Sequence, residues 1–99
     1  MEPSISEADA QAALRQVRIE MYATEWCGSC RRAREYLHDN GIAYTEYDIE
    51  RDESAKRRLA EINPRASVPT FRIDDIVQVG FSPEGFEQKL NEAVLRRLY

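Results

Sequence analysis

Hydrophobic and polar residues recur at two different periods along the chain. Residues 17–23 alternate with period two, with Ile19, Met21 and Ala23 among the apolar positions, and this alternation predicts a strand. Residues 54–62 instead place Ala55 and Leu59 four positions apart, which predicts the apolar face of a helix. The same patterns along the chain predict strands at residues 17–23, 42–49, 70–73 and 76–79, and helices at residues 31–40, 54–62 and from 82 toward the C-terminus.

Residues that favour turns and helix ends separate these segments. Asn40-Gly41 predicts the end of the first helix, and Asp52 predicts the cap of the second. Asp74-Asp75 lies between two short strands and predicts a hairpin. Ser82-Pro83 predicts the start of the last helix, with proline in its first turn.

The predicted order is β–α–β–α–β–β–α. Two strands joined by a crossover helix pair in parallel, whereas a hairpin adds antiparallel strands. We therefore expect an α/β domain with a four-stranded mixed sheet and helices on both faces, spanning residues 17–99. Residues 1–16 form an N-terminal extension, and its residues 6–15 fit either a short helix capped by Ser6 or a frayed segment.

Composition restricts the chain to a few protein classes. Its 99 residues suffice for one domain, and its net charge of −4 disfavours nucleic-acid binding. No apolar run reaches the roughly 18–20 residues of a membrane-spanning helix. The N-terminus shows no basic segment followed by an apolar one, so a cytoplasmic location is expected.

The two cysteines, Cys27 and Cys30, lie between the first predicted strand and the first predicted helix. This placement of a C-x-x-C pair is typical of a thioredoxin-like redox motif. Cys27 is expected at the helix N-terminus, which favours the reactive thiolate, as an exposed nucleophile. Cys30, one turn further and facing inward, is expected to resolve the mixed disulfide formed on Cys27.

Other residues around the pair allow more than one interpretation. Arg31, Arg32 and Arg34 either add positive potential near the thiolate or form a solvated helix face. A structural zinc site needs four ligands, whereas the chain has two cysteines and one histidine, His38. We therefore expect no metal in a monomer and place His38 on the helix surface, while a cluster shared between two chains stays open because each chain can contribute a thiolate.

Four segments resemble glutaredoxins: residues 21–30, 37–44 with 47–49, 66–70 and 79–83. The resemblance implies the thioredoxin-like fold and a thiol–disulfide oxidoreductase that acts in electron transport and cell redox homeostasis. It also implies that Pro69 follows a cis peptide bond and that the backbone of Val68 pairs with an extended substrate. The substrate-binding residues implied in this way are Thr24, Trp26, Ser67, Val68, Pro69, Gly80, Phe81 and Ser82.

The chain also departs from the family pattern. Thr24 stands where glutathione-using glutaredoxins commonly have lysine, and Gly28-Ser29 replaces their Pro-Tyr pair. Trp26-Cys27-Gly28 resembles thioredoxins and mycoredoxin-like proteins. Residues 80–83 are similar to the Gly-Phe-x-Pro of glutaredoxin-like hydrogen donors for ribonucleotide reductase, which take electrons from thioredoxin reductase. Arg65 and Arg72 either supply charge for an anionic substrate or lie on the surface.

These observations predict an enzyme that reduces protein disulfides or mixed disulfides of low-molecular-weight thiols. We expect a monomer without tightly bound cofactor, with glutathione or another small thiol as co-substrate, and glutathione or thioredoxin reductase as electron source. An alternative is an iron–sulfur carrier or sensor that bridges a [2Fe–2S] cluster between two chains. A third interpretation is an adaptor that uses Trp26 and Phe81 as contact residues.

Overall fold

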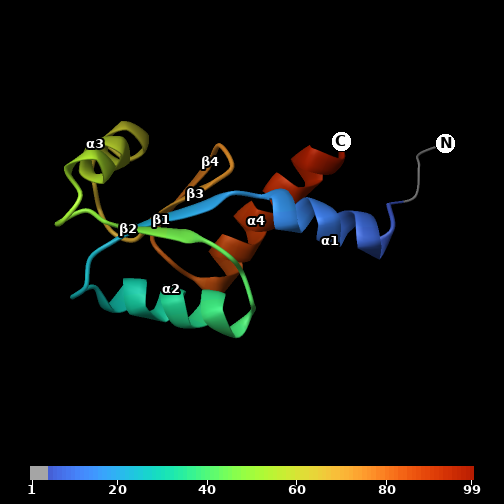
Figure 1. Ribbon diagram of the computed structural model, residues 1–99, viewed down its shortest axis with the longest axis horizontal. Helices are drawn as coiled ribbons and strands as arrows, with labels where there is room; N and C mark the ends of the chain where they lie inside the picture. Colours follow the sequence, from blue (N-terminus) through green and yellow to red (C-terminus); the bar gives the residue numbers. More distant parts are fainter. Residues whose placement is uncertain (1–4) are drawn as a thin grey trace.

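The computed structural model describes residues 5–99 (Figure 1). Four helices and four strands follow one another along this part of the chain. They are α1 (Glu7–Gln16), β1 (Ile19–Ala23), α2 (Gly28–Asp39), β2 (Thr45–Asp48), α3 (Glu53–Ile62), β3 (Thr70–Ile73), β4 (Ile76–Val79) and α4 (Pro83–Leu98).

The four strands form one mixed sheet in the order β2-β1-β3-β4. β1 runs parallel to β2, as the crossover through α2 requires, and antiparallel to β3. β3 and β4 form the predicted hairpin. At the centre of the sheet, Tyr22 is paired with Tyr47 on β2 and with Thr70 on β3. The predicted fold class is confirmed.

Helices cover both faces of the sheet, with α3 above it and α2 below it in Figure 1. The larger core joins α2 and α4 to one face through fully buried side chains such as Met21, Leu37, Phe71 and Phe86. On the other face, Tyr22 packs against Ala55 and Leu59 of α3. The period-two pattern of β1 assigns Tyr22 to its polar face. Because helices cover both faces of the sheet, Tyr22 is nevertheless as buried as its apolar neighbours Met21 and Ala23.

Two predicted strands are shorter in the structure because their first residues serve the preceding helix. Val17 is the C-cap of α1 and donates its N–H to the Leu14 carbonyl. Ile42 donates its N–H to the Leu37 carbonyl after Gly41, which has a φ of 63°, turns the chain at the end of α2. Conversely, α2 begins three residues before the predicted position, at Gly28, because Cys27 caps it.

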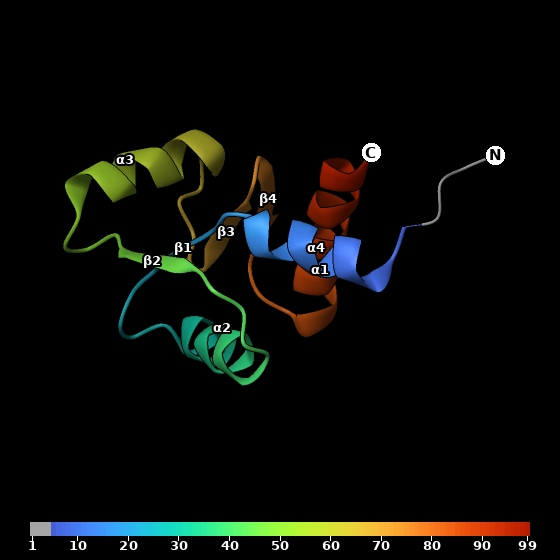
Figure 2. The ribbon, with the colours of Figure 1, turned by 45° about the vertical axis from the view of Figure 1, so that its right-hand side comes forward.

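Residues 7–16 of the N-terminal segment form α1, whereas residues 1–4 of that segment lie outside the described residues. Ser6 and Asp9 make a capping box, in which each side chain accepts a hydrogen bond from the other residue's backbone N–H. α1 packs across α4 (Figure 2). Within residues 5–99, no helix has the length and apolar character needed to cross a membrane.

Candidate active site

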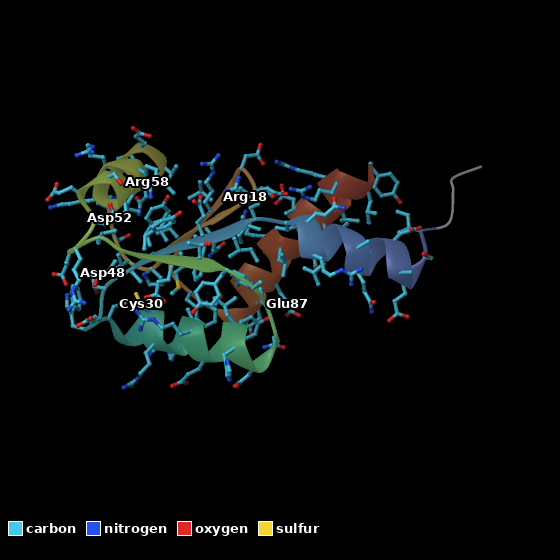
Figure 3. All side chains as sticks on the ribbon, viewed as in Figure 1. Arg18, Cys30, Asp48, Asp52, Arg58 and Glu87 are labelled. Carbon is cyan, nitrogen blue, oxygen red and sulfur yellow. The ribbon has the colours of Figure 1, made fainter. Side chains whose placement is uncertain are left out.

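The two cysteines lie at the N-terminal end of α2, directly after the loop that follows β1. Cys27 is the N-cap residue, and its Sγ accepts a hydrogen bond of 3.1 Å from the backbone N–H of Cys30. Figure 3 shows Cys30 in the first turn of α2, on the side that faces the sheet. Both cysteines are free thiols. The cap position satisfies one of the unpaired N–H groups that every helix has at its start.

Cys27 is less accessible than the sequence suggested. Only 7% of the residue is exposed, so the expectation that Cys27 is exposed is wrong, and Cys30 is fully buried. The cause is the direction of the Cys27 side chain. Its Sγ turns toward the helix start and lies 3.8 Å from the Val68 carbonyl oxygen, to which the thiol donates. Cys27 Sγ therefore lies between the helix start and the segment that contains Val68.

The surroundings of the two sulfurs differ. The pKa of Cys30 is raised to about 12, first by burial and then by its hydrogen bond with Cys27, while a backbone hydrogen bond from Thr24 and the charge of Arg34 oppose this rise. Cys30 is consequently a neutral thiol near pH 7. A negative charge on Cys27 instead faces the N–H of Cys30 and the positive end of the helix dipole. This arrangement suits Cys27 as the attacking sulfur and Cys30 as the resolving one.

The segment opposite Cys27 contains the Val68–Pro69 peptide bond, which is cis. Buried Asn63, at the end of α3, holds this segment with its side-chain amide, which donates to Ser67 Oγ at 3.0 Å and to Thr70 Oγ1 at 3.1 Å. The Thr70 hydroxyl in turn donates to the Ser67 carbonyl at 2.8 Å. Sequence reasoning assigned Asn63 no part in the site and missed this role. An asparagine followed by proline gives no signal of contacts made seven residues later.

A groove of about 640 Å³ opens on the α3 side of this segment. It brings together four of the predicted substrate-binding residues, namely Thr24, Trp26, Ser67 and Val68. Sequence reasoning missed the residues that α3 and the loop before it contribute. We call this cavity the Trp26 groove, and its polar and charged lining comprises Thr24, Trp26, Glu50, Glu53, Lys56 and Ser67.

The segment after β4 lies outside the lining of this groove. Gly80, with a φ of 78°, donates its N–H to the Pro69 carbonyl at 2.8 Å and so borders the cis peptide. Phe81 packs its ring against Tyr36 and Phe71, with centroids 5.5 and 6.2 Å away. Ser82 caps α4 by accepting from the Gly85 N–H. Phe81 thus contributes packing to the core beneath the site.

The arginines after Cys30 have separate roles. Arg31 is exposed, and Arg32 donates to Ser29 Oγ at 2.9 Å. Arg34 links α2 to β2 through a two-pronged contact with Glu46 and also donates to the Thr24 carbonyl, at 3.1 Å. These contacts order the loop before Cys27 and hold Arg34 beside the dithiol.

The remaining predicted polar residues lie apart from the groove. Arg65 and His38 are exposed, and exposed Arg72 donates to the Asp74 carbonyl in the hairpin turn. Within the described part of the chain, no three histidine, cysteine or carboxylate side chains are grouped so as to hold a metal ion.

Comparisons with known proteins agree with this geometry. The sequence model of the glutaredoxin family matches residues 19–77. The crystal structure of the thioredoxin-like protein BC3987 has 37% sequence identity and a TM-score of 0.67, over 72% of this chain and 97% of that one. A glutaredoxin from Methanosarcina mazei Go1 has 26% identity and a TM-score of 0.67, over 74% and 77% of the two chains. Glutaredoxin 3 of Escherichia coli K12 is 29% identical over 56 residues, which are 57% of this chain and 68% of that protein.

Proposed function

Because this chain belongs to the glutaredoxin family, whose members are thiol–disulfide oxidoreductases, we propose that it reduces disulfides with Cys27 as nucleophile and Cys30 as resolving cysteine. One observation carries this assignment. Cys27 Sγ sits at the start of α2, where it accepts the Cys30 N–H and lies beside the Val68 backbone, whereas Cys30 is buried as a neutral thiol.

The reaction proceeds by two thiol–disulfide exchanges. The Cys27 thiolate attacks one sulfur of a substrate disulfide. That S–S bond breaks, a mixed disulfide forms on Cys27, and the departing thiolate takes up a proton. Cys30 then loses its proton and attacks Cys27 Sγ, which releases the second substrate thiol and leaves a Cys27–Cys30 disulfide. Two electrons have passed to the substrate, and an external thiol or reductase restores them.

The Val68 segment positions the substrate in this proposal. An extended substrate that runs antiparallel to Ser67-Val68 adds a backbone strand beside the sheet, and this places its disulfide next to Cys27. Thr24 and Trp26, which line the groove on the α3 side, contact this substrate. The backbone of residues 80–82 borders Pro69 on the other side, where a helix start favours an anionic group.

We propose protein disulfides and mixed disulfides of small thiols as substrates, with the chain acting as a monomer in the cytoplasm. Glutathione or another low-molecular-weight thiol is the co-substrate, and glutathione or thioredoxin reductase supplies the electrons. Parallel turnover assays with each electron source decide between them. A cluster shared between two chains draws no support from the described residues or from the comparisons.

The test is reduction of the mixed disulfide of glutathione and 2-mercaptoethanol by the wild type and two variants. Cys27→Ser is expected to have no activity, because the attacking sulfur is gone. Cys30→Ser is expected to retain part of the activity, because glutathione itself can resolve the mixed disulfide on Cys27. Activity that survives in Cys27→Ser, or that is lost equally in Cys30→Ser, contradicts the assigned roles.

A further inference from the structure

The lining of the Trp26 groove suggests what kind of substrate the protein selects. Trp26 is 71% exposed, yet its indole is held in place, since Nε1 donates to Glu50 Oε1 at 3.1 Å. This contact presents an aromatic surface next to a carboxylate. A guanidinium or ammonium group is attracted by an aromatic face as well as by a carboxylate, so the pair suits a basic side chain.

The charges around the groove favour the same class of ligand. Its ionisable lining consists of the carboxylates Glu50 and Glu53 and the ammonium of Lys56, which leaves an excess of negative charge. Arg51, adjacent to Glu50, does not offset that charge because it pairs with Glu25 at 3.0 Å and with Asp48 at 3.7 Å. A substrate with two carboxylates, such as glutathione, meets repulsion here that a basic peptide does not.

A buried hydroxyl provides an independent indication of a ligand. Thr24 is only 2% exposed and lines the groove, and its Oγ1 is the one buried side-chain oxygen or nitrogen within residues 5–99 that has no hydrogen-bond partner. Most buried polar groups in proteins have a hydrogen-bond partner. The carbonyl of the same residue is already bound by Arg34. The protein itself therefore supplies no partner for this buried hydroxyl within residues 5–99.

We propose that the Trp26 groove selects disulfides in protein segments that carry a lysine or arginine beside the cysteine, in preference to glutathione disulfides. The inference rests on the proposed function, because it needs the substrate disulfide to lie at Cys27. The basic side chain lies over the Trp26 ring and pairs with Glu50, while Glu53 adds to the negative potential. Thr24 Oγ1 hydrogen-bonds to the substrate next to the reacting cysteine.

The experiment compares two peptides, each joined through its single cysteine to 2-mercaptoethanol and identical except for arginine or glutamate beside that cysteine. The wild type is expected to show a kcat/KM about tenfold higher for the arginine peptide at low salt, with a ratio that shrinks as salt screens the charges. Glutathione disulfide is measured alongside. The neutral disulfide of 2-mercaptoethanol serves as a reference without charge.

Two double variants separate the local charge from the net charge. In Glu50→Gln with Glu53→Gln, the arginine-to-glutamate ratio is expected to approach one. Glu35→Gln with Glu61→Gln removes the same net charge from exposed positions outside the groove lining and is expected to keep the wild-type ratio. Thr24→Val is expected to raise KM for the arginine peptide more than it lowers kcat, because it removes a binding contact.

Three results would overturn the proposal. The first is a wild-type ratio near one, and the second is an unchanged ratio in the Glu50 and Glu53 double variant. The third is a preference for glutathione disulfide that Lys56→Gln abolishes, which would show that the groove binds carboxylates. Reduction of the neutral disulfide without any charge preference refutes only the selectivity. Failure to reduce any of the four disulfides refutes the proposed function as well.

Discussion

The hydrogen bonds of Asn63 allow a quantitative prediction about the segment that faces Cys27. The Asn63 side chain makes three hydrogen bonds: it donates to Ser67 Oγ and Thr70 Oγ1 and accepts from the Arg65 N–H. A hydrogen bond contributes about 0.5–1.5 kcal/mol net. We therefore expect Asn63→Ala to lower the free energy of unfolding by about 2–3 kcal/mol, which corresponds to roughly 10–20 °C in Tm for a domain of this size.

The assay is a double-mutant cycle in urea. Thr70→Val removes the hydroxyl that accepts from Asn63 and donates to the Ser67 carbonyl, while it keeps the side-chain volume close to that of threonine. If the groups act as one network, the loss in the double variant should fall short of the sum of the single losses by about 0.5–1.5 kcal/mol. Additive losses would refute the network and leave Asn63 as an ordinary helix end.

Two further predictions concern contacts outside the site. Arg97 holds the pKa of Asp74 below its usual value through a two-pronged contact at 2.8 and 2.9 Å, so the stability that this contact gives is present above pH 3.8 and is lost as the pH falls further. Asparagine tolerates the φ of 55° at position 74. Asp74→Asn should therefore lower the free energy of unfolding by about 1–2 kcal/mol at pH 7, measured by chemical unfolding, and the difference from the wild type should vanish near pH 2. A difference that stays constant with pH would contradict the electrostatic origin. Ser6→Ala removes half of the capping box and should cost α1 about 1 kcal/mol, seen as faster amide hydrogen exchange in α1 but not in β1. Unchanged exchange in α1 would mean that its packing on α4, not its cap, holds the helix.

The elements that local patterns predict well are those whose signals lie close together in the sequence. The Asp74-Asp75 turn between two short apolar runs became the β3–β4 hairpin, and Ser82-Pro83 became the start of α4. The expected position of Cys27 at a helix start is observed as well. Each of these turns and helix starts depends on interactions between residues that are neighbours in the sequence, so the local pattern suffices to predict it.

The features that could not be predicted depend on contacts between distant segments. The burial of Cys27 requires Val68, which lies 41 residues away and reaches the helix start only when β3 pairs with β1. The Trp26 groove likewise combines the loop after β1 with α3 and the cis-proline segment. Glu50 gave no signal in the sequence, since an exposed glutamate in a charged loop is ordinary until Trp26 is placed against it.

The different chemistry of the two cysteines follows from a spacing of one helical turn. Cys27 caps α2 and accepts a hydrogen bond from the Cys30 N–H. Cys30 points into the core, where burial raises its pKa. Part of that rise comes from Cys27 itself, through the hydrogen bond and the charge between the two sulfurs. In the proposed mixed disulfide, Cys27 carries no charge and no thiol. The part of the rise in the Cys30 pKa that comes from Cys27 is then absent. In the proposed mechanism, the attack of Cys27 on the substrate disulfide therefore favours ionisation of Cys30 at the step in which Cys30 attacks the mixed disulfide.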